Sequence, residues 1–115
     1  MKRTALSLAL MAAALIMVSG VALAKTFIGT DANNTIVGTQ QVDVIEGRGG
    51  NDVLRGALGA DRISGGNGTD RQYGGRGYDV IDTDGGYKDI VDCGRGIDTA
   101  YVDSRDEVRN CERLR

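Results

Sequence analysis

The chain has 115 residues with 18 glycines, no histidine, no tryptophan and a formal net charge of −2. This length allows one small domain, and the charge argues against the basic surface of a nucleic-acid-binding protein. The absence of histidine removes the usual base of serine and cysteine hydrolases.

The first segment in chain order, residues 1–24, has the pattern of a secretory signal peptide. The basic pair Lys2-Arg3 precedes an apolar run at 5–18 and a small-x-small cleavage sequence, Ala-Leu-Ala. The apolar run is short for a membrane span. We therefore expect an exported protein without a membrane span that begins at Lys25. In that mature chain 12 basic residues face 16 acidic ones, a net charge of −4.

A nine-residue repeat begins at Gly29 and runs without a gap to Asp82. The first place is glycine in all six units, and the eighth place is Ile or Leu in five and Gln72 in the other. The sixth-place residues are Asn34, Asp43, Asp52, Asp61, Asp70 and Asp79. Self-similarity at a fixed period is the signature of a repeat architecture.

Each unit predicts a turn followed by a very short strand. The glycines of G-G-x-G-x-D can take positive φ, which lets backbone carbonyls converge. The three residues after the turn, such as 53–55, form the strand and direct the eighth residue of the unit inward. Two units close one coil of about eighteen residues, and coils stack at the strand spacing of about 4.8 Å. The inward Ile and Leu side chains then form a thin apolar ladder.

After the sixth unit one extra residue near Thr83 interrupts the nine-residue period, which then resumes. Asp89 and Asp98 take the sixth place of the next two turns. From Tyr101 the repeat is absent, and we expect residues 101–115 to form a terminal cap, which an open stack of repeats needs.

Cys93 and Cys111 are the two cysteines of the chain. An even pair in an exported protein predicts one disulfide. The alternatives are free thiols or a metal site. A tetrahedral zinc site of the usual kind needs four Cys or His ligands, which this chain lacks.

Stacking puts each turn above the turn two units earlier, so the sixth-place residues form two rows. One row holds Asp43, Asp61, Asp79 and Asp98, and the other holds Asn34, Asp52, Asp70 and Asp89. The carboxylates repel one another, and no cationic side chain recurs regularly enough to neutralise them. Calcium accepts six to eight carboxylate and carbonyl oxygens. The pattern therefore predicts calcium between successive turns; Asx-turn chemistry alone is the alternative role of the aspartates.

These residues closely resemble the RTX, or haemolysin-type, calcium-binding nonapeptide repeat, G-G-x-G-x-D-x-U-x with U large and apolar. Residues 65–70 and 74–79 spell its turn in full. The resemblance implies a parallel β-roll that binds calcium in two rows of turns and is often unfolded without it. The implied main side-chain ligands are Asp52, Asp61, Asp70 and Asp79, with Asp43, Asp89 and Asp98 as further candidates. The implied backbone ligands are the first- and third-place oxygens of Gly47 and Gly49, Gly56 and Leu58, Gly65 and Asn67, and Gly74 and Arg76.

The chain departs from this pattern in three places. The first two units, GTDANN and GTQQVD, lack the second and third glycines, so we expect weak or absent calcium there. Gln72 stands in an apolar slot, and the insertion near Thr83 shifts the register before Asp89. In the family the repeats usually follow a toxin, protease or lipase without a cleaved signal, so those activities are not carried over.

We thus expect an all-β protein, a parallel β-roll or right-handed β-solenoid with a disulfide-linked C-terminal cap. Residues 1–24 are the signal peptide, 25–100 the calcium-binding roll and 101–115 the cap, whose sequence resembles the end of small secreted bacterial calcium-binding repeat proteins. The expected protein is no enzyme. It binds calcium as a secreted binding or surface module, with an extracellular protein or envelope polymer as the partner class. The alternatives are a structural solenoid that does not need calcium, for which no threonine row is present, and a small hydrolase.

Overall fold

The computed structural model describes residues 24–85 and 87–115, which form short parallel strands. The predicted signal peptide falls on residues 1–24, of which 1–23 lie outside the described part. The strands are β1 (Lys25–Ile28), β2 (Thr35–Val37), β3 (Asp43–Glu46), β4 (Val53–Arg55), β5 (Arg62–Ser64), β6 (Arg71–Tyr73), β7 (Val80–Asp82), β8 (Ile90–Asp92), β9 (Thr99–Tyr101), β10 (Glu107–Arg109) and β11 (Arg113–Leu114).

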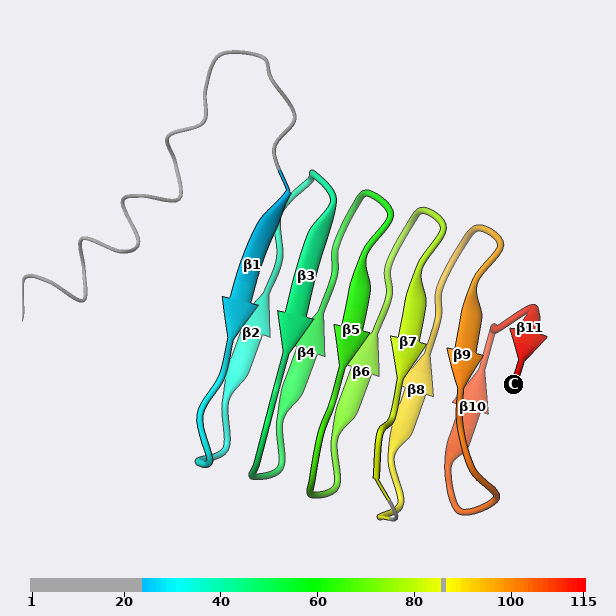
Figure 1. Ribbon diagram of the computed structural model, residues 1–115. Coiled ribbons are helices and arrows are strands. Elements are labelled where there is room, and N and C mark those ends of the chain that lie inside the picture. Colours follow the sequence, from blue (N-terminus) through cyan, green and yellow to red (C-terminus); the bar gives the residue numbers. More distant parts are fainter. Residues whose placement is uncertain (1–23, 86) are drawn as a thin grey trace, which may run out of the picture.

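The chain winds between two parallel sheets that lie one behind the other, with turns along both edges (Figure 1). The odd-numbered strands form one sheet in the order β1-β3-β5-β7-β9-β11, and the even-numbered strands form the other in the order β10-β8-β6-β4-β2. Ile36 pairs with Leu54 and Ile45 with Ile63, one eighteen-residue coil apart. The all-β parallel roll expected from the repeat is therefore confirmed.

A single-file ladder of eighth-place side chains fills the space between the sheets. One sheet contributes Ile45, Ile63, Ile81 and Ala100, and the other contributes Leu54, Gln72 and Val91, all buried. Because successive side chains of a strand point to opposite faces, a three-residue strand directs only its middle residue inward. Each strand therefore contributes one side chain to the core, and Gln72 is the polar residue among these side chains.

The insertion near Thr83 is absorbed in a turn rather than in a strand. Strand β8 pairs with β6 in regular parallel register, with Gln72 opposite Val91, nineteen residues on. Thr83 is buried, and its backbone N–H donates to Tyr101 O at 3.1 Å. This is the contact that first-place glycines make elsewhere, for example Gly65 N to Asp82 O at 3.1 Å.

Strands β10 and β11 add a further, shorter coil, which the sequence rhythm did not predict. Glu107 lies beside Ile90 and Arg113 beside Thr99. The predicted disulfide is present: Cys93 and Cys111, eighteen residues apart with a Cα–Cα distance of 5.1 Å, join the last two coils. The boundary between roll and cap at residue 100 stays a prediction.

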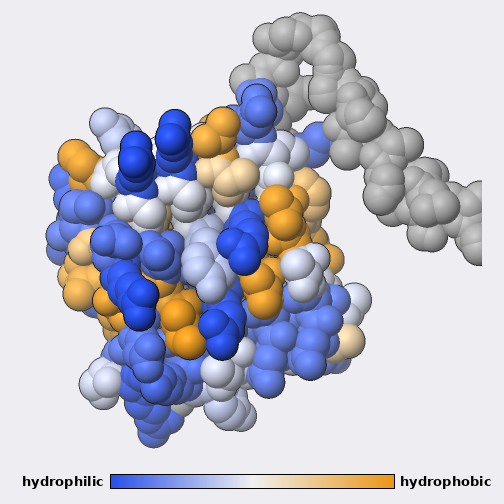
Figure 2. All heavy atoms as spheres, turned by 180° about the vertical axis from the view of Figure 1, so that it is seen from behind, coloured by the Kyte–Doolittle hydropathy of each residue, from blue (hydrophilic) through white to orange (hydrophobic). Residues whose placement is uncertain are grey.

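The outer surface mixes polar and apolar side chains. From behind, hydrophobic residues are scattered among hydrophilic ones (Figure 2). Within the described part of the chain, no helix has the length and apolar character needed to cross a membrane.

Candidate metal centre

The sixth-place side chains form two hydrogen-bonded rows, one along each edge of the roll. The backbone N–H of each residue donates to the Oδ1 of the equivalent residue one coil further on. Asp43 N lies 2.8 Å from Asp61 Oδ1, and Asp61 N lies 2.9 Å from Asp79 Oδ1. The other row runs from Asn34 through Asp52 and Asp70 to Asp89 with distances of 2.7 Å. The order within each row is the one that stacking of eighteen-residue coils predicts.

Both rows continue into the last coil through two residues that the sequence reasoning missed. Asp89 N donates to Asp106 Oδ1 and Asp98 N donates to Glu112 Oε1, each at 2.9 Å. The glycines that mark earlier turns are absent here. A usable signal remains, because Val108 and Leu114 each follow an acidic residue by two places, as the apolar residue does in four of the six repeats.

The second oxygen of six of these carboxylates has no hydrogen-bond partner in the protein. The six carboxylates are themselves buried, with at most 1% of each side chain exposed. The unpartnered atoms are the Oδ2 oxygens of Asp52, Asp61, Asp70, Asp79, Asp89 and Asp98. Buried polar atoms are nearly always hydrogen-bonded, and a buried charge needs a counter-charge or a metal. These oxygens are therefore suited to a cation.

A peptide carbonyl converges on the same point as the Oδ2 atoms of Asp52, Asp61 and Asp79. A Cβ atom at Gly47 would lie 2.6 Å from Asp52 Oδ2 and 2.8 Å from Gly65 O of the next coil. At Gly74 it would lie 2.6 Å from both Asp79 Oδ2 and Cys93 O. Only glycine fits at such a point, because no real Cβ approaches an oxygen so closely. The carbonyls brought to the sixth-place side chains in this way are those of Gly47, Gly56, Gly65, Gly74 and Cys93.

The predicted third-place residues lie on the outer side of the turns. Leu58, Asn67 and Arg76 are exposed and Gly49 is half-buried. The N–H groups of Gly49 and Leu58 donate to Thr30 O and Thr39 O of the previous coil at 3.2 and 3.3 Å. These contacts hold the turns together, and a calcium contact through the third-place carbonyls stays a prediction.

The first two turns differ from the later ones at the second place. There Thr39 N donates to Asp43 Oδ2 at 2.6 Å, and its hydroxyl lies 2.9 Å from Asp43 Oδ1. Thr30 N donates to Asn34 Oδ1 at 2.7 Å in the same way. Asp43 thus has the hydrogen bonds that the other six carboxylates lack.

Later turns place their second residue in the left-handed region instead. The φ angles are 71° at Arg48, 74° at Ala57, 78° at Gly66 and 85° at Gly75. Glycine takes this conformation without the steric cost that a Cβ brings. In these turns no hydrogen bond links the second-place N–H to a sixth-place Oδ2.

Burial makes these carboxyl groups weak acids. It raises the pKa of Asp61, Asp70 and Asp79 to about 7, partly opposed by the backbone N–H bond that each accepts and reinforced by neighbouring carboxylates. The pKa of Asp89 rises to about 6 for the same main reason, and those of Asp52 and Asp98 are also raised by burial. The charged form is therefore held at a cost that a bound cation relieves.

Side chains alone do not complete a site. Among residues 24–85 and 87–115, no three Cys, Asp or Glu side chains are grouped closely enough to hold a metal. A metal here has to combine carboxylates with peptide carbonyls. Calcium accepts this donor set, since it takes six to eight oxygens of both kinds in flexible geometry. The residues present thus fit calcium.

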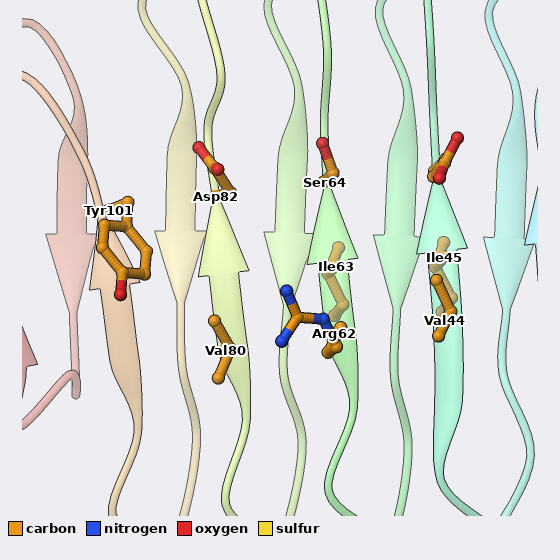
Figure 3. A pocket seen from close by; sticks show the side chains of 9 residues that line it. Val44, Ile45, Arg62, Ile63, Ser64, Val80, Asp82 and Tyr101 are labelled. Atoms are coloured by element: carbon orange, nitrogen blue, oxygen red, sulfur yellow. The ribbon is translucent and has the colours of Figure 1, made fainter. Parts of the chain in front are cut away.

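A hollow of about 170 Å³ lies on the outer face of the odd-numbered sheet, away from both rows. Val44, Arg62 and Val80 line one part of it, and Ser64, Asp82 and Tyr101 line the other (Figure 3). Its lining contains none of the row carboxylates.

Comparison with protein families finds one match. Residues 28–63 and 47–81 match the family described as RTX calcium-binding nonapeptide repeat (4 copies). Over residues 28–81 the chain therefore consists of RTX repeats, which confirms the resemblance, and RTX nonapeptide repeats bind calcium ions. Comparisons with curated proteins and with solved structures give no significant match.

Proposed function

We propose that the protein binds calcium ions along the two rows and that calcium stabilises the roll. The observation that carries this proposal is the set of buried Oδ2 atoms without a hydrogen-bond partner. The side-chain ligands are Asp52, Asp61, Asp70, Asp79, Asp89 and Asp98. The first-place carbonyls beside them and the third-place carbonyls of the turns supply neutral oxygens.

Each part of a turn has a separate task in this proposal. The carboxylate supplies charge through Oδ2 while its Oδ1 holds the next coil by a backbone hydrogen bond. First-place glycine leaves room for both oxygens. Magnesium demands a near-ideal octahedron and gives up its water reluctantly, so it suits this mixed donor set poorly.

The turn of Asp43 is expected to hold calcium more weakly than the later turns. Its carboxylate already accepts hydrogen bonds from the backbone and hydroxyl of Thr39. A cation at Asp43 would compete with these bonds, whereas at Asp61 it would meet an oxygen without a partner.

We further propose that the protein works outside the cell, as a binding or surface module without catalytic activity. The Cys93–Cys111 disulfide supports this, because disulfides persist in oxidising compartments. The signal peptide over residues 1–24, the roll over 25–100 and the cap over 101–115 belong to the same proposal. Ordered turns of the calcium form would meet another extracellular protein or an envelope polymer.

Far-UV circular dichroism of the disulfide-bonded protein tests the calcium dependence. At a temperature just above the melting point of the calcium-depleted protein, a calcium titration should give a cooperative gain of β-structure that magnesium does not reproduce. A spectrum and a melting temperature that are both indifferent to calcium would overturn the proposal. The Oδ1 hydrogen-bond rows and the apolar ladder would then be sufficient, and a structural solenoid would be the better reading.

A further inference from the structure

Gln72 is a polar residue in a place that is otherwise apolar. It lies in the middle of β6, between Leu54 of β4 and Val91 of β8, and its side chain is fully buried. Neither Oε1 nor Nε2 has a hydrogen-bond partner in the protein. Leaving a buried polar group unpaired destabilises the fold. The apolar side chains around Gln72 offer no hydrogen-bond partner, so its amide is suited to a ligand.

The amide lies beside the carboxylate of Asp70. A Cβ atom at Gly65 would lie 2.6 Å from Asp70 Oδ2 and equally 2.6 Å from Gln72 Nε2. Both side chains are fully buried, that of Asp70 immediately before β6 and that of Gln72 in the middle of the strand. Two buried groups without partners thus flank one point in the turn.

At other turns that second position belongs to a peptide oxygen. It is Gly65 O beside Gly47 and Cys93 O beside Gly74. Beside Gly65 the corresponding carbonyl would come from Thr83, the residue at the insertion, yet the three nearest atoms come from Asp70 and Gln72. At Gly65 the amide of Gln72 is thus closer to this point than any carbonyl of the next coil.

We propose that Gln72 is a calcium ligand of the Asp70 turn, with Oε1 in the role that a first-place carbonyl has in other turns. The inference rests on the calcium binding proposed above. Glutamine carbonyl oxygens are accepted calcium ligands. Rotation of the amide about its last bond exchanges Oε1 and Nε2 in nearly the same space. Here Nε2 is the amide atom nearest to the point beside Gly65, and a half-turn of the amide would bring Oε1 there when an ion is bound.

The test compares wild type and Gln72→Leu as full-length, disulfide-bonded proteins, with calcium chloride as the ligand. Isothermal titration gives the number and affinity of sites, and thermal unfolding is followed with calcium and in calcium-depleted buffer. We expect the variant to melt higher than wild type without calcium, because Leu extends the ladder as Leu54 does. With calcium it should lose one site or bind there at least tenfold more weakly.

Two further variants separate a ligand from a packing residue. Ile63→Leu changes the ladder without adding or removing an oxygen, so its calcium titration should match wild type. Gln72→Glu keeps an oxygen at the site, so it should retain the calcium site while lowering the melting temperature without calcium.

If Gln72→Leu melts higher in both conditions and its calcium titration is unchanged, Gln72 is not a ligand. The proposed calcium binding of the roll would still stand. Failure of wild type itself to bind calcium would instead overturn the proposed function.

Discussion

The first two turns and the four that follow share a repeat but satisfy their carboxylates differently. In the turn of residues 38–43, Thr39 donates its N–H and hydroxyl to Asp43. In the turn of residues 56–61, Ala57 takes a φ of 74° and Asp61 Oδ2 stays without a partner. The second place of the unit thus decides whether the protein satisfies both carboxylate oxygens or leaves one without a partner.

The roll therefore has turns whose carboxylates are fully hydrogen-bonded and turns whose carboxylates keep one oxygen without a partner. The far end resembles the first two turns, since Asp106 Oδ2 accepts from the Thr83 hydroxyl at 3.0 Å and from Asp103 N at 2.9 Å. The unpartnered carboxylates therefore lie in the middle of each row. Sensitivity to calcium should be concentrated there.

The largest expected effect is on pH dependence without calcium, because several carboxyl groups act together. The pKa values of Asp61, Asp70 and Asp79 are raised from 3.8 to about 7. Between these values the folded protein binds more protons than the unfolded chain, so stability falls as pH rises. In calcium-depleted buffer, denaturant unfolding should show a more stable protein at pH 5 than at pH 8. A free energy of unfolding that increases from pH 5 to pH 8 would show that these carboxyl groups are not held protonated by burial.

Replacing one carboxylate in a threonine turn and one in a later turn tests whether calcium stabilises only the later turns. Asp61→Ala removes the acceptor of the Asp43 N–H, worth about 1–3 kcal/mol, and a site worth about 2.7 kcal/mol when calcium stands at 100 times its Kd. Asp43→Ala should cost the same with and without calcium, because its lost partner is Thr39. Asp103→Ala, an exposed residue outside the rows, is the control: it loses a hydrogen bond from Arg105 N at 2.8 Å and should lower stability by the same small amount with and without calcium. Equal calcium responses of Asp61→Ala and Asp43→Ala, measured by denaturant unfolding, would refute the division.

Removal of the disulfide tests how much it stabilises the C-terminal end of the roll, opposite the threonine turns. An eighteen-residue loop closed by Cys93 and Cys111 should stabilise the fold by about 3 kcal/mol on the chain-entropy estimate. Unfolding of Cys93→Ala/Cys111→Ala should show this loss, and hydrogen exchange should place it in β8 and β10. A loss spread equally over β1 and β3 would show that the disulfide acts on the whole roll.

The smallest effect concerns Thr39. Thr39→Val keeps the backbone N–H bond to Asp43 and removes the hydroxyl bonds at 2.9 and 3.1 Å. We expect a loss of about 1 kcal/mol, equal in calcium and in calcium-depleted buffer, by thermal unfolding. A loss seen only with calcium would place an ion at this turn after all.

A strict repeat made most of the fold predictable. Glycine at the first place, an acidic residue at the sixth and an apolar one at the eighth determine where a turn ends and which side chain points inward. The coil of eighteen residues then orders the two rows, as the pairing of Asp43 with Asp61 shows.

What escaped prediction depends on backbone geometry that residue types do not specify. That Thr39 satisfies Asp43 depends on the φ of the second place. Asp106 and Glu112 join the rows through a coil of different length and without glycine markers. The approach of Gln72 to the Asp70 turn depends on the side-chain conformation of Gln72, which its place in the repeat does not specify.

Anomalous diffraction from crystals grown with calcium would locate each ion relative to each turn and so show which carboxylates bind calcium. We predict calcium peaks beside the Oδ2 atoms of Asp52, Asp61, Asp70 and Asp79 and none beside Asn34 or Asp43. Peaks of equal strength at Asp43 and Asp61, or a fully ordered roll without any peak in the two rows, would contradict this prediction.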